Sequence, residues 1–256
     1  MSSEDILSLT PPLADRRVAY GADPNQFLDV RLPHGTGPHP VLVNIHGGYW
    51  RAKYNLAHAG HLCEALRAAG VATFNVEYRR VGNDGGGWPG TFADIRSAYA
   101  YVRQEYSRFH LDVKRLAVMG HSAGGQLALC LAAHESSLRA AISLAGVVDL
   151  KKAFTLHLSN DAVVDFLGGK PSDVAEHYRE ADPMELNIVH ARQWVLHGSD
   201  DDTVPVAFSR DYAAQKKKAG ERLELIEVAR AGHFDFIDPR SEAFQQVKRA
   251  VLSALA

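Results

Sequence analysis

The feature that most constrains this chain is the run Gly120-His121-Ser122-Ala123-Gly124, which stands between a strand-type and a helix-type segment. Residues 116–119 before it are apolar, and residues 127–131 after it are apolar with good helix formers. A G-x-S-x-G pattern between strand and helix is typical of a nucleophile elbow, in which a sharp turn lifts a serine hydroxyl above a sheet. Side chains at the two glycine positions would collide with the strand and helix that the turn brings together. We therefore predict Ser122 as a nucleophile.

The rest of the chain alternates short apolar β-type runs with amphipathic helical stretches, which indicates an α/β fold: a mostly parallel sheet covered by helices on both faces. The expected strands are 26–32, 41–45, 71–77, 116–119, 140–144, 193–196 and 223–228, and the expected helices are 56–69, 92–102, 123–133, 206–218 and 241–255. Residues 151–190 contain helical patches but no clear strand. We expect a single domain over 1–256, with 151–190 as an insertion or small cap.

Charge and length exclude several classes of protein. The 28 basic and 30 acidic residues leave a formal charge of -2, so no basic stripe is available to neutralise a phosphate backbone, and nucleic acid is not expected as a partner. A chain of 256 residues buries roughly three-quarters of its unfolded surface, so its core needs no metal or disulfide support. We expect no cofactor and no metal.

The cysteines and the first residues give expectations about the compartment. Cys63 and Cys130 fall in helical segments, where buried reduced thiols are the usual state. The N-terminus carries acids where a secretory signal would carry positive charge, and no apolar run approaches the length of a membrane span. These observations favour a soluble, cytoplasmic protein, and the sequence is compatible with a homo-oligomer.

A second glycine-rich run, His46-Gly47-Gly48-Tyr49-Trp50, follows directly on the expected strand 41–45. The second oxyanion element of a nucleophile-elbow fold is expected in a loop of this kind. We predict the backbone N–H groups of Gly48, Tyr49 and Ala123 as oxyanion donors. The alternative is a tight turn with a core histidine. His46 is expected to hold the loop through side-chain hydrogen bonds.

The acid should lie between Ser122 and the base, because the chain order in such folds is serine, acid, histidine. Asp200-Asp201-Asp202 follows the expected strand 193–196 and precedes Val204-Pro205, where a helix can open. Three adjacent aspartates cannot all face one imidazole. We choose Asp201 and leave its neighbours as helix caps or solvent-facing groups.

Of the 13 histidines, His233 alone follows the last expected strand and precedes the terminal helix, which makes it the candidate general base. His58 and His61 are spaced as a metal pair could be. Because no third ligand cluster accompanies them, we read them as ordinary helix residues.

Together these motifs resemble the esterase and arylformamidase (kynurenine formamidase) branch of the α/β-hydrolases. The resemblance is carried by the two glycine-rich runs, by His197 to Pro205, by Gly232-His233 and by the segment from Tyr20 to Pro33. In that family the acid is the fifth residue of His-Gly-x-x-Asp-x-x-Val-Pro, which falls on Asp201. Tyr49 stands where the related hormone-sensitive-lipase group has a third glycine.

The resemblance implies hydrolysis of small carboxylic esters or of an N-formyl aryl amide without a cofactor. We expect a serine carboxylesterase first and an arylformamidase as the alternative, with small-molecule esters or formamides as substrates. A non-catalytic binding protein on a hydrolase scaffold is the alternative from another class. An acyltransferase is a further alternative, because an alcohol can intercept the same acyl-enzyme. Trp50, Trp88, Phe154 and Phe166 are expected to line an acyl or aryl pocket, although each also suits a core.

Overall fold

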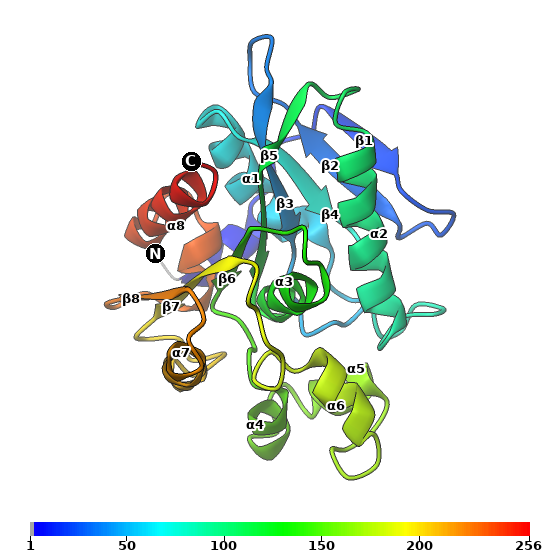
Figure 1. The fold of residues 1–256 in the computed structure, drawn as a ribbon, viewed down its shortest axis with the longest axis vertical. Coiled ribbons are helices and arrows are strands. Elements are labelled where there is room, and N and C mark those ends of the chain that lie inside the picture. Colours follow the sequence, from blue (N-terminus) through cyan, green and yellow to red (C-terminus); the bar gives the residue numbers. More distant parts are fainter. Residues whose placement is uncertain (1–2) are drawn as a thin grey trace.

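The computed structural model describes residues 3–256 and contains an eight-stranded sheet in the order β1-β2-β4-β3-β5-β6-β7-β8 (Figure 1). The strands are β1 (Arg16–Ala19), β2 (Phe27–Arg31), β3 (His39–Ile45), β4 (Ala72–Val76), β5 (Leu111–His121), β6 (Ala140–Leu144), β7 (Arg192–Gly198) and β8 (Leu223–Val228). The pairs β1–β2 and β2–β4 are antiparallel, and every other neighbouring pair is parallel. The α/β fold predicted from the alternating pattern is confirmed.

Helices connect the parallel strands and cover both faces of the sheet. The α-helices are α1 (Gly60–Ala68), α2 (Gly90–Gln104), α3 (Ala123–His134), α4 (Leu150–Thr155), α5 (Ala162–Leu167), α6 (Ala175–Ala181), α7 (Ala207–Lys218) and α8 (Glu242–Ala254). Three 3-10 helices complete the chain: η1 (Ser3–Ser8), η2 (Leu56–Ala59) and η3 (His233–Ile237).

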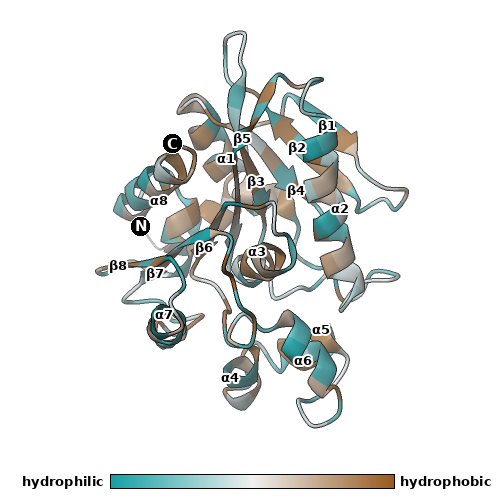
Figure 2. Cartoon of the chain, in the orientation of Figure 1, coloured by the Kyte–Doolittle hydropathy of each residue, from teal (hydrophilic) through white to brown (hydrophobic). Residues whose placement is uncertain are grey.

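Two apolar clusters, one on each face, make up the core. Along β3, Val43 belongs to the cluster shared with α2, α3 and α7, whereas its neighbour Leu42 belongs to the cluster shared with α1 and α8. This alternation follows from strand geometry, since successive side chains point to opposite faces. In Figure 2 hydrophobic residues recur along the central strands, and hydrophilic residues recur along α8. The central strands are therefore fixed from both sides, and their ends are rigid platforms for loops.

The sequence did not predict the N-terminal elements. β1 is an edge strand whose residues are mostly exposed, so Arg16 and Arg17 hide any period-two apolar signal. η1 falls in a segment for which the sequence predicted no helix or strand. β5 begins at Leu111, five residues before the apolar run at Leu116, because its first half pairs at the rim of the sheet.

Residues 151–190 form α4, α5 and α6, which are short helices at one end of the molecule (Figure 1). No strand occurs in this region, as expected. Its role as a cap stays a prediction. No helix within residues 3–256 is both long and apolar enough to cross a membrane.

Candidate active site

The four motif loops all leave the sheet at the carboxyl ends of parallel strands. The glycine-rich loop follows β3, Ser122 follows β5, Asp201 follows β7 and His233 follows β8. β3 lies between β4 and β5, and the chain reverses its direction across the sheet there. Ligands of open α/β sheets bind at such a switch point, outside the carboxyl ends of the strands. The topology thus gathers distant segments at one rim.

Ser122 occupies a strained turn between β5 and α3. Its φ of 57° and ψ of -121° lie outside the regions that non-glycine residues ordinarily adopt. Within residues 3–256 the serine side chain does not cap α3, which leaves its hydroxyl for the cavity that it lines. A Cβ on Gly120 would lie 2.0 Å from the Gly124 carbonyl oxygen, and one on Gly124 would lie 2.1 Å from the Ile45 oxygen. The predicted steric reason for both glycines is confirmed.

The loop after β3 presents its backbone amides in a left-handed conformation. Gly48, Tyr49 and Trp50 have φ values of 110°, 49° and 56°. Tyr49 adopts the conformation that a glycine would provide without strain. The hydroxyl of Tyr49 donates to the carbonyl oxygen of Thr203 at 3.0 Å, which ties this loop to the loop that carries Asp201.

His46 holds the same loop through side-chain hydrogen bonds, as predicted. Its Nδ1 lies 2.7 Å from the Gly47 carbonyl oxygen and its Nε2 lies 3.0 Å from Oε1 of Glu77. Glu77 also accepts the backbone N–H of Leu56 and pairs with Arg80 at 2.9 Å. The sequence offered no signal for Glu77, because this contact depends on β3 and β4 lying side by side.

Asp201 and His233 form a close pair. Nδ1 of His233 lies 2.7 Å from Oδ2 of Asp201, and both side chains are buried. Oδ1 of Asp201 accepts the backbone N–H groups of Thr203 and Val204 at 3.0 and 2.8 Å. Nδ1 of His233 must carry a proton to bond a carboxylate, so Nε2 is left as the basic nitrogen.

A second histidine also contacts Asp201. Nε2 of His197 lies 3.1 Å from Oδ2 of Asp201 and 2.8 Å from the Val204 carbonyl oxygen. Burial would raise the pKa of Asp201, but hydrogen bonds from His197 and His233 outweigh it and hold this pKa well below its usual value. Asp201 is therefore an anion throughout the neutral range.

His121, the variable residue of the elbow motif, contacts the backbone of the base. Its Nε2 donates to the carbonyl oxygen of His233 at 2.9 Å, and the two rings lie 4.6 Å apart. Burial, followed by the nearby imidazole of His233, lowers the pKa of His121 well below the ordinary value. Sequence reasoning missed this residue, although its place beside Ser122 was the available signal.

Ser122 and His233 line one cavity of about 610 Å³. The remaining lining, within residues 3–256, comes from the N-terminal segment, the loop after β3, η2, the end of β5 and the loops that follow β7 and β8. Its residues are Glu4, Leu7, Leu9, Pro11, Gly48, Tyr49, Lys53, Tyr54, Asn55, Ala57, His58, His121, Thr203 and Phe234. Burial, followed by the charge of His46, lowers the pKa of His58 to about 3, so this histidine is neutral. None of these lining residues comes from 151–190.

The aromatic residues expected in the pocket lie elsewhere. Trp50 and Phe166 stack at 4.5 Å with both rings buried, and the Trp50 indole N–H donates to Gln126 at 3.0 Å. Trp88 stacks on Phe92 at 5.2 Å, and Phe154 lies against His157 at 6.2 Å. The expectation is corrected because Trp50, Trp88 and Phe166 pack against one another, and none of the four residues lines the cavity that contains Ser122.

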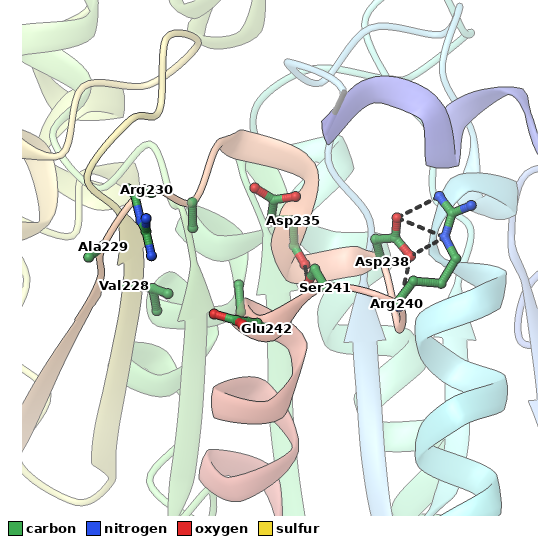
Figure 3. Close-up of a pocket in the computed structure, with 10 residues that line it drawn as sticks. Val228, Ala229, Arg230, Asp235, Asp238, Arg240, Ser241 and Glu242 are labelled. Carbon is green, nitrogen blue, oxygen red and sulfur yellow. Dashed lines mark hydrogen bonds and ion pairs between the residues drawn. The ribbon is translucent and has the colours of Figure 1, made fainter. Parts of the chain in front are cut away.

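A second hollow, of about 260 Å³, opens beside the start of α8 (Figure 3). Asp238 pairs with Arg240 there at 2.6 Å, and Arg230 lies at the opposite side. Ser241 contributes the hydroxyl group of this hollow. The hydroxyl accepts the N–H of Phe244 as the cap of α8 and donates to the Asp235 carbonyl oxygen. Because this hydroxyl is used for capping, the hollow holds no comparable nucleophile.

The cysteines and paired histidines add no reactive centre. Cys63 and Cys130 are buried free thiols, as expected, and burial raises the pKa of Cys63 to about 12. Among residues 3–256 no cluster of three or more histidine, cysteine or acidic side chains has a geometry that could hold a metal ion.

A mostly parallel sheet with this strand order, a serine elbow after β5 and a buried carboxylate–histidine pair after β7 and β8 define an α/β-hydrolase of the esterase branch. The chain belongs to the BD-FAE family, whose model matches residues 28–215. The matched region includes Ser122 and Asp201 and ends before His233.

Relatives and solved structures agree with this placement. The chain is 30% identical to esterase LipC of Mycobacterium tuberculosis over 87% of its own length and 60% of that protein. It is 25% identical to a probable isoprenylcysteine alpha-carbonyl methylesterase, ICMEL1, of Arabidopsis thaliana, over 94% of its own length and 56% of that protein. The chain thus spans little more than half of these curated relatives.

Among solved structures, the native esterase Est2 of Thermogutta terrifontis superposes with a TM-score of 0.76 at 25% identity, covering 95% of this chain and 92% of that one. A truncated carbohydrate esterase from gut microbiota superposes with a TM-score of 0.82 at 20% identity over 96% of this chain and 99% of that one. The second match supports the fold alone.

Proposed function

We propose that this protein is a serine carboxylesterase that hydrolyses small esters through an acyl-enzyme on Ser122. The observation that carries the proposal is the 2.7 Å bond between His233 and Asp201, with His233 lining the same cavity as a serine held in a strained elbow. Backbone strain of this kind is characteristic of active sites. The names of the relatives, esterases and a methylesterase, support ester bonds as the target.

The first half of the reaction forms the acyl-enzyme. Oγ of Ser122 attacks the ester carbonyl carbon, and Nε2 of His233 takes the hydroxyl proton. We infer that the Ser122 hydroxyl and Nε2 of His233, which line the same cavity, come into hydrogen-bonding distance when substrate binds, as catalytic hydrogen bonds commonly do. Asp201 remains ionised and stabilises the imidazolium. The tetrahedral intermediate then collapses, and the departing alkoxide takes the proton back from His233.

The second half releases the acid. Water attacks the acyl carbon while His233 takes a proton, and Ser122 leaves with that proton restored. The N–H groups of Gly48, Tyr49 and Ala123 bind the oxyanion in both halves. Each such donor contributes on the order of a hundredfold to turnover. The left-handed backbone at Gly48 and Tyr49 supports this assignment, because it turns the amides of the loop away from regular pairing.

The experiment compares p-nitrophenyl acetate with N-formylkynurenine on the wild type and on Ser122→Ala. We expect the acetate to be the better substrate and the variant to lose roughly a millionfold in kcat. A strong preference for the formamide would replace the carboxylesterase with an arylformamidase. Retention of most activity in Ser122→Ala would remove the acyl-enzyme.

A fluorophosphonate probe separates an enzyme from a non-catalytic protein on the same scaffold. We expect the folded wild type to become labelled on Ser122 and Ser122→Ala to remain unlabelled. An unlabelled wild type would favour the binding-protein reading, in which the intact triad performs no chemistry.

A further inference from the structure

We propose that the N-terminal segment Glu4–Pro11 forms the selectivity wall of the active site and that Leu7 and Leu9 bind the apolar part of a medium-chain, neutral ester. This inference rests on the proposed esterase function and names the class of ester. Leu7, Leu9 and Pro11 line the same cavity as Ser122 and His233, although more than 110 residues separate them from the serine.

Three contacts fix the position of this segment on the rest of the domain. Ile6, 2% exposed, belongs to the apolar cluster that also contains Phe236 and Ile237 of η3. A Cβ on Gly60 would lie 2.6 Å from Cβ of Pro11, so the chain passes directly over the start of α1.

The third anchor is the buried guanidinium of Arg31, whose Nη2 donates to the Pro12 carbonyl oxygen at 2.7 Å. η1 packs against η3, the helix that begins with His233. In Figure 1 the blue segment at the N-terminus lies next to the orange segment that contains η3.

Several large side chains that line this cavity are apolar and exposed. Among residues 3–256, the large hydrophobic side chains that are markedly exposed include Leu7 at 45%, Leu9 at 41% and Tyr54 at 40%, and all three line this cavity. Exposed apolar groups that converge on one concave site mark a ligand surface. Phe234, next to the base, adds a further ring to the lining. An alkyl chain is the group that such a lining binds.

The charges in the cavity favour a neutral substrate. Glu4 and Lys53 carry opposite signs, and the Lys53 ammonium lies 4.8 Å from the centre of the Tyr54 ring. His58 and His121 are neutral because burial lowers the pKa of each. Apart from the triad, the lining therefore has no net charge with which to select an acid or a cation. The volume of about 610 Å³ leaves room for a chain longer than acetyl.

The test measures kcat/KM for p-nitrophenyl acetate, butyrate and octanoate and, as a second series, for ethyl and hexyl acetate. The variants are Leu7→Ala, Leu9→Ala and their double variant. Leu13→Ala is the matched control, since Leu13 is 93% exposed and lies outside this cavity in the described chain. We expect each leucine variant to lose roughly tenfold in kcat/KM on the long-chain member of one series. The values for p-nitrophenyl acetate and ethyl acetate should stay within about twofold of the wild type, and Leu13→Ala should match the wild type on every ester.

If the acyl series loses activity on its long-chain member, the acyl chain of the ester contacts the wall; if the alcohol series does, the alcohol chain contacts it. Either response supports the proposal. Equal losses on short and long esters would overturn it, since they would show that the segment only stabilises η3. Unchanged selectivity in the double variant would overturn it too. Leu9→Trp is the converse variant: the larger side chain should reduce octanoate or hexyl acetate hydrolysis and spare the short ester. If Ser122→Ala retains activity on every ester, the proposed function itself has failed, and this is distinguishable from a failure of the wall.

Discussion

Nε2 of His121 donates a hydrogen bond of 2.9 Å to the backbone carbonyl oxygen of His233, so the residue next to the nucleophile holds the main chain of the base. The elbow and the base loop are joined across 112 residues of sequence by this bond. Asp201 fixes the ring of His233 and His121 fixes its backbone. The base is therefore held at two points before substrate arrives, which is the preorganisation that catalytic groups require.

The first prediction follows from that bond. We expect His121→Leu to lower kcat by roughly tenfold, because a hydrogen bond of about 1 kcal/mol is lost and the buried carbonyl of His233 is left unpaired. His121→Gln should recover most of the rate, since its Nε2 can donate from a similar position. Single-turnover rates on p-nitrophenyl acetate measure the effect. Equal activity of the two variants would show that volume alone matters at this position.

Asp201→Asn tests the orientation of His233. Oδ1 of Asp201 is held by the N–H groups of Thr203 and Val204, so the amide NH₂ of the variant must take the place of Oδ2 and face His233 and His197. His233 would then keep its proton on Nε2 and lose its function as a base. We expect kcat to fall about 10⁴-fold with little change in thermal unfolding. Asp202→Asn is the control, and a comparable loss there would move the acid to the neighbouring residue.

Much of this site could be predicted from sequence, because Ser122, Asp201 and His233 each sit just beyond a recognisable strand and strand ends meet at one rim. His121 and Glu77 could not be assigned in this way, since their partners depend on which loops and strands become neighbours. The wall at Leu7 and Leu9 was missed because η1 has no clear periodicity. Trp50 and Phe166 were misassigned because an aromatic residue suits a core and a pocket equally well.

A carboxylate outside the active site should contribute to the pH dependence of stability. Burial raises the pKa of Asp182 from 3.8 to about 7, although backbone N–H groups of Leu150, Met184 and Lys151 partly offset this. Between these two pH values the folded protein holds a proton that the unfolded chain has released. The contribution of Asp182 to stability therefore falls as pH rises from about 4 to 7 and is constant above that range.

We expect Asp182→Asn to reduce the difference in unfolding free energy between pH 5 and pH 8 by about 2 to 3 kcal/mol. Urea unfolding at the two pH values measures this change. Asp173→Asn is the control, because Asp173 is an exposed carboxylate of the same 151–190 region. A difference between the two pH values as large in Asp182→Asn as in the wild type would show that Asp182 is already ionised in the folded protein at pH 5.

Tyr49 joins the two loops that must keep a fixed distance during catalysis. Its hydroxyl donates to the Thr203 carbonyl oxygen at 3.0 Å, while its own amide is a proposed oxyanion donor. Burial, followed by the charge of Asp201, raises the pKa of Tyr49 to about 12, so the phenol keeps its proton at neutral pH.

Tyr49→Phe should lower kcat by roughly three- to tenfold and leave KM nearly unchanged, because the bond aligns the oxyanion loop with the loop that carries Asp201 and does not touch the bound ester. Tyr54→Phe is the matched control, since Tyr54 lines the same cavity and within residues 3–256 its hydroxyl makes no such bond to the loop that carries Asp201. A rise in KM without a change in kcat would instead make Tyr49 a substrate contact.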